Sequence, residues 1–146
     1  MKQLILSFSL LLLCVGVGAV SAAPDRVITR EQLPAMAQQF LHDYFPSAEV
    51  TAAHEDGDIV QREYDVMLDD GTHIEFAADG RWLEIESREA LPRGIVPPSI
   101  VTYTAKHYPS LTIHRIERSR REWEVSLSNG VEIRFNRRFS VISIDD

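Results

Sequence analysis

Cysteine is nearly absent from this chain: there is one in 146 residues, Cys14, and it lies in an apolar N-terminal stretch. A fold held together by disulfide bonds is therefore excluded for residues 23–146, which contain no cysteine. A thiol nucleophile is excluded there for the same reason. The stability of the fold has to come from packing.

Sequence motifs for catalysis and for metal binding are lacking as well. There is no GxSxG motif, and none of the five histidines forms an HxxxH, HxH or HExxH spacing. His54 and His73 could meet across neighbouring strands, but exposure to solvent is the simpler interpretation. The acidic segment 55–58 begins no calcium-loop pattern that ends in glutamate. We therefore predict no catalytic residue, no metal site, no cofactor and no enzymatic activity.

Positive charge is in deficit, because 15 Lys and Arg stand against 22 Asp and Glu and give a net charge of −7 with neutral histidines. Removal of residues 1–22 would take away Lys2 and no acid, so the charge would become −8 (−7 minus 1). An acidic surface argues against nucleic acid and anionic lipid as partners, since both are polyanions. It is compatible with a basic partner.

The N-terminus has the pattern of a secretory signal peptide. Lys2 precedes an apolar run from Leu4 to Val20, and the small residues 21–23 follow it. The run is short for a membrane span of about 20 residues. Cys14 follows three leucines rather than a small residue, which argues against lipidation. We predict cleavage after Ala22, a periplasmic or secreted location, and no stable membrane insertion after cleavage.

The remainder of the chain matches itself in two blocks. Phe45–Ser47 corresponds to Tyr108–Ser110 at a shift of 63 residues, and Gly71–Phe76 corresponds to Gly130–Phe135 at a shift of 59. The difference of four residues falls between residues 113 and 122, where a shorter hairpin tip absorbs it most easily. The sequence therefore predicts two copies of one structural unit, at 23–88 and 89–146.

Each predicted copy changes from helical to strand-like periodicity. Apolar residues recur at helical spacing after Pro34 and again from about Pro98. Alternating apolar and polar residues then predict strands near 48–54, 61–69, 72–77 and 82–87 in the first copy. The predicted fold class is α+β: a tandem repeat of two units, each a helix followed by a four-stranded antiparallel β-meander, with the two sheets packed together or continuous.

These segments carry a family resemblance. Tyr44-Phe45-Pro46, the strand and turn at 64–71 and the segment 79–83 follow one another in the order found in the PepSY-like family of secreted bacterial proteins. Residues 123–130 repeat part of that order. The family is similar in fold to the beta-lactamase-inhibitor proteins. The resemblance implies a tandem pair of helix-plus-four-strand units and a non-catalytic periplasmic or secreted binding module.

Two departures from the family pattern limit what the resemblance implies. The second copy has Arg138-Phe139 where the first has Asp79-Gly80, so its last turn is free to differ in geometry. Beta-lactamase-inhibitor proteins have disulfides, which residues 23–146 cannot form. Their inhibitory loops have no residue-by-residue counterpart here.

The candidate binding residues lie on the sheet face that should turn away from the helices, and at a hairpin tip. If Leu83 and Ile85 point inward, strict alternation turns neighbouring side chains outward. Interface hot spots favour Trp, Tyr and Arg, although a tryptophan could equally cover the sheet or pack against the other copy. The predicted protein-binding set is Trp82, Met67, His73, Arg134 and Phe139.

Two functions follow from these patterns. The first is an exported, non-catalytic module that binds another exported or envelope protein and inhibits or regulates an envelope hydrolase or peptidase. The alternative is an envelope structural or stress protein that buffers a small ligand or a metal. The sequence does not indicate an oligomeric state.

Overall fold

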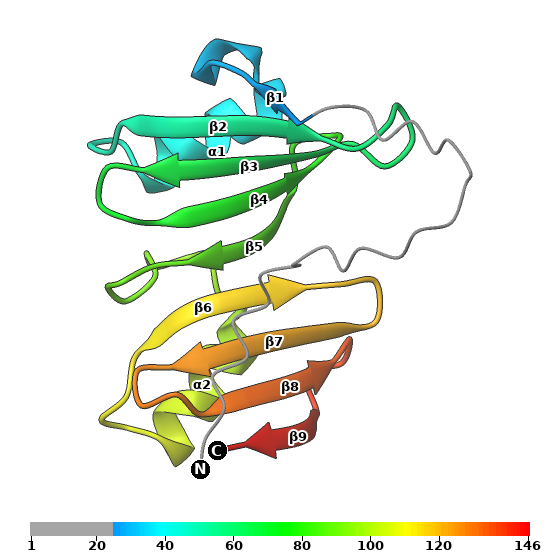
Figure 1. Cartoon of the computed structure of the whole chain (residues 1–146). Coiled ribbons are helices and arrows are strands. Elements are labelled where there is room, and N and C mark those ends of the chain that lie inside the picture. The colour runs from blue at the N-terminus through cyan, green and yellow to red at the C-terminus, as the bar shows by residue number, and fades with distance from the viewer. Residues whose placement is uncertain (1–24) are drawn as a thin grey trace, which may run out of the picture.

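The computed structural model describes residues 25–146, which form one antiparallel sheet with helices on one of its faces (Figure 1). The elements in chain order are β1 (Arg26–Val27), the short 3₁₀ helix η1 (Arg30–Gln32), α1 (Ala35–Tyr44), β2 (Val50–Asp56), β3 (Glu63–Leu68), β4 (His73–Ala77), β5 (Trp82–Glu86), α2 (Pro98–His107), β6 (Ile113–Arg118), β7 (Glu122–Leu127), β8 (Glu132–Asn136) and β9 (Val141–Asp145).

The predicted fold class is wrong. The described residues form one nine-stranded sheet with two α-helices, a mostly β fold rather than a tandem repeat of two helix-plus-four-strand units. Strands β5 and β6 pair directly, with Glu84 opposite Glu117 and Glu86 opposite Arg115, so the hydrogen-bond ladder has no break there. Alternation within a strand predicts that strand, but it does not predict which strand pairs with it after a long connection. The two-residue β1 was not predicted because it is too short to show a period.

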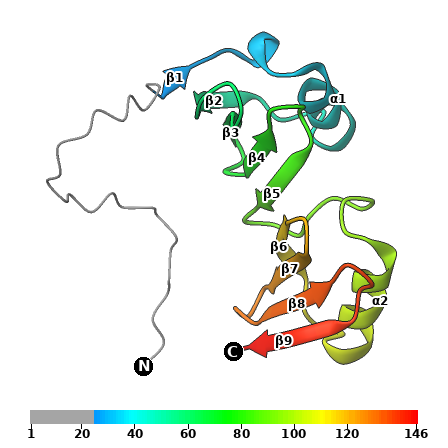
Figure 2. The same cartoon turned by 90° about the vertical axis from the view of Figure 1, so that its right-hand side faces the viewer.

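Both α-helices lie on the same face of the sheet (Figure 2). Ala37 and Leu41 of α1 are buried, as are Ile100 and Thr104 of α2. Below them, one row of apolar residues crosses eight strands in register, each directly opposite the next. The row is Ala53, Val66, Ile74, Ile85, Ile116, Val125, Ile133 and Ile144.

The hairpin turns need left-handed backbone at defined positions. Gly80 (φ 86°) ends the β4–β5 turn, and its N–H donates to the carbonyl of Ala77 at 2.8 Å. Phe139 (φ 61°) takes the corresponding place in the β8–β9 turn, and its N–H donates to the carbonyl of Asn136 at 3.0 Å. The two turns thus share a geometry, although a non-glycine residue adopts it with more strain.

The predicted signal peptide, residues 1–22 with cleavage after Ala22, lies outside the described residues. Within the described part of the chain, no helix has both the length and the apolar character that crossing a membrane requires. The proposed boundaries of two copies, 23–88 and 89–146, stay a prediction.

Candidate functional site

The sheet face opposite the helices, here called the open face, carries a row of acidic side chains. Each acid lies directly opposite the next on the neighbouring strand, one residue away from the apolar row of the core. Alternation along each strand therefore places the acids on the open face. The five acids, here called the acidic row, are Asp65, Glu75, Glu84, Glu117 and Glu124.

The first part of the acidic row consists of Asp65 and Glu75, and its nearest basic group is a histidine. Nε2 of His73 lies 2.9 Å from an Oδ1 oxygen of Asp65. This hydrogen bond raises the pKa of His73, although burial alone would lower it. Burial, together with the charges of Glu84 and Asp65, raises the pKa of Glu75 to about 7. Near neutral pH, Glu75 is therefore a carboxyl group poised between its acid and its ionised form.

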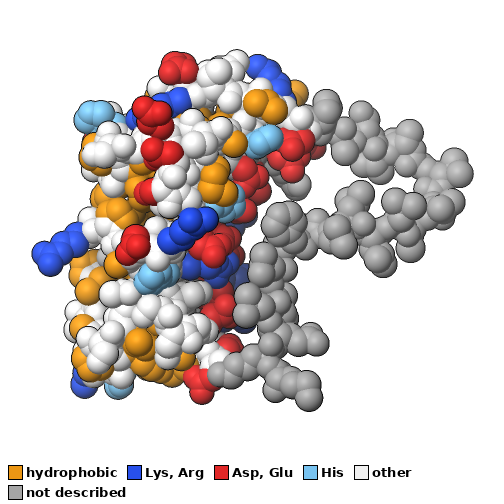
Figure 3. All heavy atoms as spheres, turned by 60° about the vertical axis from the view of Figure 1, so that its left-hand side comes forward, with side chains coloured by type: hydrophobic (Ala, Val, Ile, Leu, Met, Phe, Trp, Pro, Cys, Tyr) orange, Lys and Arg blue, Asp and Glu red, His pale blue; other side chains and the backbone are white. Residues whose placement is uncertain are grey.

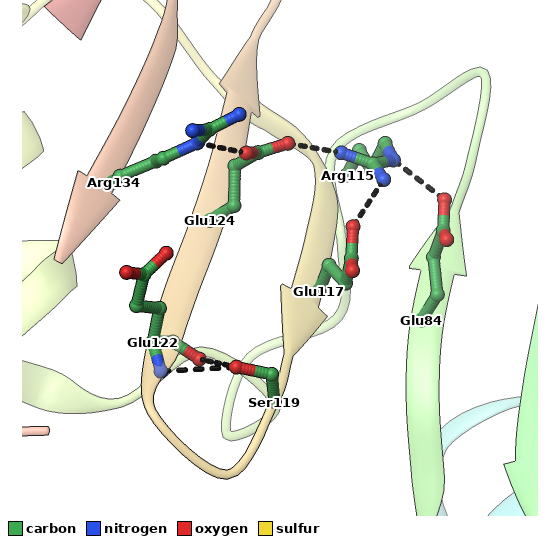
Figure 4. A network of polar contacts seen from close by, with 7 residues as sticks. All are labelled: Glu84, Arg115, Glu117, Ser119, Glu122, Glu124 and Arg134. Atoms are coloured by element: carbon green, nitrogen blue, oxygen red, sulfur yellow. Dashed lines mark hydrogen bonds and ion pairs between the residues drawn. The ribbon is translucent and has the colours of Figure 1, made fainter. Parts of the chain in front are cut away.

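The second part of the acidic row consists of Glu84, Glu117 and Glu124, and arginine neutralises it (Figure 4). Arg115 contacts carboxylates of Glu84, Glu117 and Glu124, the last at 2.8 Å. Arg134 contacts the other oxygen of Glu124 at 2.6 Å. Burial alone would raise the pKa of Glu124, but hydrogen bonds from the two guanidinium groups outweigh it and lower the pKa.

Burial and the neighbouring carboxylates also have opposite effects on the pKa of Arg115. Burial alone would lower it, but the carboxylates of Glu84 and Glu124 outweigh burial and raise it. The three glutamates thus favour the charged form of Arg115. The second part of the row is a closed set of ion pairs, whereas the first part is not.

A hollow of about 750 Å³ lies on the open face beside the first part of the acidic row. Its walls come from β2, β3 and β4 and from the segment after β5. Asp65, Met67, His73 and His54 contribute side chains to it. Figure 3 shows the wider setting, in which red, blue and pale-blue side chains form a band along the right-hand side of the described surface. The hollow offers a ligand carboxylate and imidazole groups, and Arg88 lines it as well.

Three of the predicted binding residues share the open face. Met67 lies directly opposite His73 in the β3–β4 ladder, and its side chain is exposed. His73 is half-buried against Asp65, and Arg134 is exposed beside Glu124. The structure therefore brings Met67 and His73 together, with Arg134 at the other end of the acidic row.

The other two predicted residues lie elsewhere. Trp82 is buried, with 8% of its surface exposed, so the expected outward orientation is wrong. Leu83 is the cause: it has no partner in the β4–β5 register, and this bulge places Trp82 opposite the buried Phe76. The Trp82 ring packs on Trp123 at 6.1 Å, and Phe139 packs on the other side of Trp123 at 5.9 Å.

The acidic row itself was missed by the sequence reasoning. Its members stand at alternate, polar positions of strands whose apolar positions were recognised, so each one looked like an ordinary solvated side chain. A usable signal was present: an acid falls at the outward position of five consecutive strands. That signal becomes visible only with the register between strands, and above all with the β5–β6 pairing.

A mostly β protein with helices on one face of a single sheet, and a charged second face, is the class that this geometry defines. The chain belongs to the PepSY-like family, described as beta-lactamase-inhibitor-like, whose model matches residues 62–143. The family predicted from the sequence is thereby confirmed. Among curated proteins, none matches this chain.

Three solved structures are similar to the chain, all from Bacteroides. One from Bacteroides vulgatus, provisionally described as a periplasmic protein of a family of unknown function, is 38% identical, with a TM-score of 0.81, and covers 88% of this chain and 100% of its own. One from Bacteroides thetaiotaomicron, provisionally described as a calcium-regulated periplasmic protein, is 33% identical, with a TM-score of 0.80, and covers 84% and 97%. A second Bacteroides vulgatus protein of unknown function, also described as periplasmic, is 29% identical, with a TM-score of 0.79, and covers 84% and 100%. Together these relatives support an exported module.

Proposed function

We propose that this protein is an exported, non-catalytic binding module whose open face recognises a basic surface on another exported or envelope protein. The observation that carries the proposal is the acidic row, which crosses five adjacent strands in register. The description of the family as beta-lactamase-inhibitor-like supports a partner that is an envelope hydrolase, which the module would inhibit or regulate.

The acidic row is costly for the isolated protein. Like charges directly opposite each other on neighbouring strands destabilise a sheet. Arginine compensates Glu117 and Glu124, but Asp65 and Glu75 have no guanidinium within 4.0 Å among residues 25–146. Lys or Arg side chains of a partner would relieve the repulsion on binding, so the folded protein would gain from an interaction that it lacks alone.

The shape of the open face also suits a protein partner. A strand surface with a hollow of about 750 Å³ can accept one or two projecting side chains. Electrostatic complementarity of this kind accelerates association and discriminates against acidic partners. The net charge of −7 acts in the same direction.

Affinity capture from an envelope extract of the source organism tests the proposal. The baits are the wild-type protein, the open-face variant Glu75→Lys/Glu117→Lys, and the control Asp43→Lys/Glu49→Lys, whose charge change is the same but whose residues lie away from the open face. We expect one partner to be retained by the wild type and the control, and lost by the open-face variant. Retention by all three baits would contradict the assignment of the open face.

The inhibitory role needs its own measurement. The captured partner, once purified, is assayed with its substrate at rising concentrations of the wild type and of the open-face variant. Inhibition by the wild type but not by the open-face variant supports the inhibitory role. If the partner binds but its activity is unchanged, the protein is a binding module and the inhibitory role is refuted.

A second function is favoured by one specific group of side chains, namely binding of a divalent cation. One ligand atom each of Asp65, His73 and Glu75 lies within 4.8 Å of the others. One relative is provisionally described as calcium-regulated. Two carboxylates suit calcium, whereas the imidazole suits zinc.

Calorimetric titration with Ca²⁺ and with Zn²⁺ tests this second function. We expect 1:1 binding that Glu75→Gln and Asp65→Asn abolish, while the control Asp43→Asn on α1 retains it. An absence of binding heat for both ions at millimolar concentration would remove the cation function and leave the protein-binding function untouched.

A further inference from the structure

A second charged region lies at one end of the sheet. Four hairpin turns meet there, β2–β3, β4–β5, β6–β7 and β8–β9, on the right-hand side of Figure 1. They border an open cleft of about 1050 Å³, here called the tip cleft. The tip cleft is separate from the acidic row, and its chemistry does not depend on the function proposed for the open face.

Arginine is concentrated around the tip cleft. The chain has 13 arginines, and seven of them lie in these turns or at the adjoining strand ends. A protein with a net charge of −7 thus gathers positive charge at one end. The seven are Arg62, Arg81, Arg118, Arg120, Arg121, Arg137 and Arg138.

Arg118 is held at the tip cleft by two contacts with Trp82. Its guanidinium carbon lies 4.0 Å from the centre of the Trp82 ring, and its Nε donates to the carbonyl of Trp82 at 2.7 Å. Among residues 25–146, no carboxylate lies within 4.0 Å of it and no hydrogen bond reaches its terminal Nη atoms. The side chain is therefore fixed in position, while its fork of donors points to no protein acceptor.

Other positive charges lie close to Arg118. Burial lowers the pKa of Arg118, and the charges of Arg81 and Arg137 lower it further. Arg137 lies over Trp123, with its guanidinium carbon 5.6 Å from the ring centre. Its Nη1 donates to the carbonyl of Ser119 at 3.3 Å, and no described carboxylate lies within 4.0 Å of it. The two arginines thus lie over the tilted pair of Trp82 and Trp123.

Four acids, Asp56, Asp58, Glu63 and Asp79, line the tip cleft together with five arginines. Asp79 binds Arg81 at 2.7 Å, and Glu55 binds Arg62 at 3.2 Å. Oδ1 of Asp58 accepts hydrogen bonds from the backbone N–H groups of Val60 and Gln61. None of these acids lies within 4.0 Å of the guanidinium group of Arg118 or Arg137, although the charge of Asp79 favours the charged form of Arg118.

We propose that the tip cleft binds a phosphate group, with Arg118 as its principal ligand and Arg137 as the second cation. A guanidinium fork matches phosphate oxygens in a bidentate arrangement, and such charge-assisted hydrogen bonds are short and strong. Arg118 and Arg137 have no carboxylate partner within 4.0 Å among residues 25–146, so a dianion that contacts both gains more than a single carboxylate does. The phosphate group can belong to free phosphate or to a phosphomonoester.

Calorimetry with inorganic phosphate at pH 7.5, with ionic strength held constant by NaCl, tests the site. We expect the affinity of Arg118→Gln to fall at least about tenfold, which is what the loss of one charged bidentate contact gives. Arg118→Lys keeps the charge without the fork and should fall in between. The control Arg93→Gln removes an exposed arginine of the β5–α2 connection and should bind like the wild type. Equal affinity in Arg118→Gln and the wild type would overturn the proposal.

Two further measurements are needed. One identifies the source of the phosphate, and the other tests whether Arg118 has only a structural role. If glycerol 3-phosphate binds more tightly than inorganic phosphate, the ligand is a phosphomonoester. If the two bind equally well, the ligand is free phosphate. Citrate that binds while both phosphates fail would overturn the phosphate assignment. If Arg118→Gln lowers the thermal midpoint but phosphate still raises that midpoint as much as in the wild type, Arg118 is a packing residue and the site is refuted.

Discussion

The two parts of the acidic row have the same geometry but opposite electrostatics. Glu75, on β4, lies between Asp65 and Glu84, and the nearest positive side chain is a histidine. Glu124, on β7, lies between two guanidinium groups. Burial and neighbouring acids raise the pKa of Glu75 to about 7, whereas the pKa of Glu124 is lowered despite its burial.

The comparison teaches that strand position does not decide the chemistry of a face. Both glutamates occupy outward positions next to a core residue, and both are partly buried. The difference lies in Arg115, which reaches across three strands, and in Arg134 on the far side of β7. The first part of the row has no arginine partner and only His73 beside Asp65, while the second part is compensated by its own ion pairs.

Removal of the central cation should have the largest effect. Arg115→Met leaves three carboxylates facing one another in a partly buried position, because Glu84, Glu117 and Glu124 lose a shared partner. We expect the free energy of unfolding at pH 7 to fall by about 3 kcal/mol, as for a broken buried ion pair. Urea denaturation measures it. The exposed Arg134→Met should lose about 1 kcal/mol or less, and equal losses would contradict a central role for Arg115.

Neutralising the compensated glutamate should destabilise the protein by a smaller amount. Glu124→Gln keeps the shape of the side chain but weakens its contacts with Arg115 and Arg134. We expect a loss of about 2 kcal/mol at pH 7, in the range for hydrogen bonds to charged groups. Thermal unfolding monitored by circular dichroism measures it. An unchanged midpoint would show that the ion pairs on β7 add nothing to stability.

The same substitution at the uncompensated position should have the opposite sign. Glu75→Gln removes a charge that repels Glu84 and Asp65. We expect a gain of about 1 kcal/mol at pH 8, less than the full pKa displacement would imply because the half-exposed carboxylate is screened by solvent. The gain should vanish at pH 4.5, where wild-type Glu75 is already protonated. A variant that is less stable than the wild type at pH 8 would break the comparison.

The pH dependence of the wild type follows from the direction of the Glu75 shift. The folded-state pKa, about 7, lies above the ordinary value of 4.5, so the native protein holds a proton that the unfolded chain releases between these values. Stability should therefore fall as pH rises from about 4.5 to 7. The raised pKa of His73 adds a smaller fall above its ordinary value of 6.5. Carboxyl ¹³C NMR titration of Glu75 checks the assignment, and a midpoint near 4.5 would contradict it.

The sequence predicted individual strands and helices because periodicity is a local property. Residues 63–68 and 73–77 alternate in the structure as they do in the sequence. It left open whether the sheets are packed together or continuous, because β5 and β6 are separated in the chain by the connector and α2. Trp82 was misplaced because a one-residue bulge at Leu83 reverses the alternation, and a sequence pattern cannot show a bulge.

The candidate site was predictable only in part. His73 and Met67 were found from alternation, since their strands are regular. The acidic row needed the register of five strands, and the cleft at the hairpin tips needed the spatial meeting of four turns. Arg118 gave no signal of its own, because its role depends on a tryptophan 36 positions away.

The order of the sheet, in which every strand pairs with its neighbours in the chain, has a consequence for folding kinetics. Most pairings close tight hairpins, which form within about 1–10 μs. The pairings β1–β2 and β5–β6 each enclose a helix and have a larger loop-closure entropy to overcome. We expect the β5–β6 ladder to form after the hairpins on either side of it. Pulsed hydrogen exchange should then show the amides of Ile85 and Ile116 protected later than that of Val66, and simultaneous protection would indicate that the sheet forms in one step.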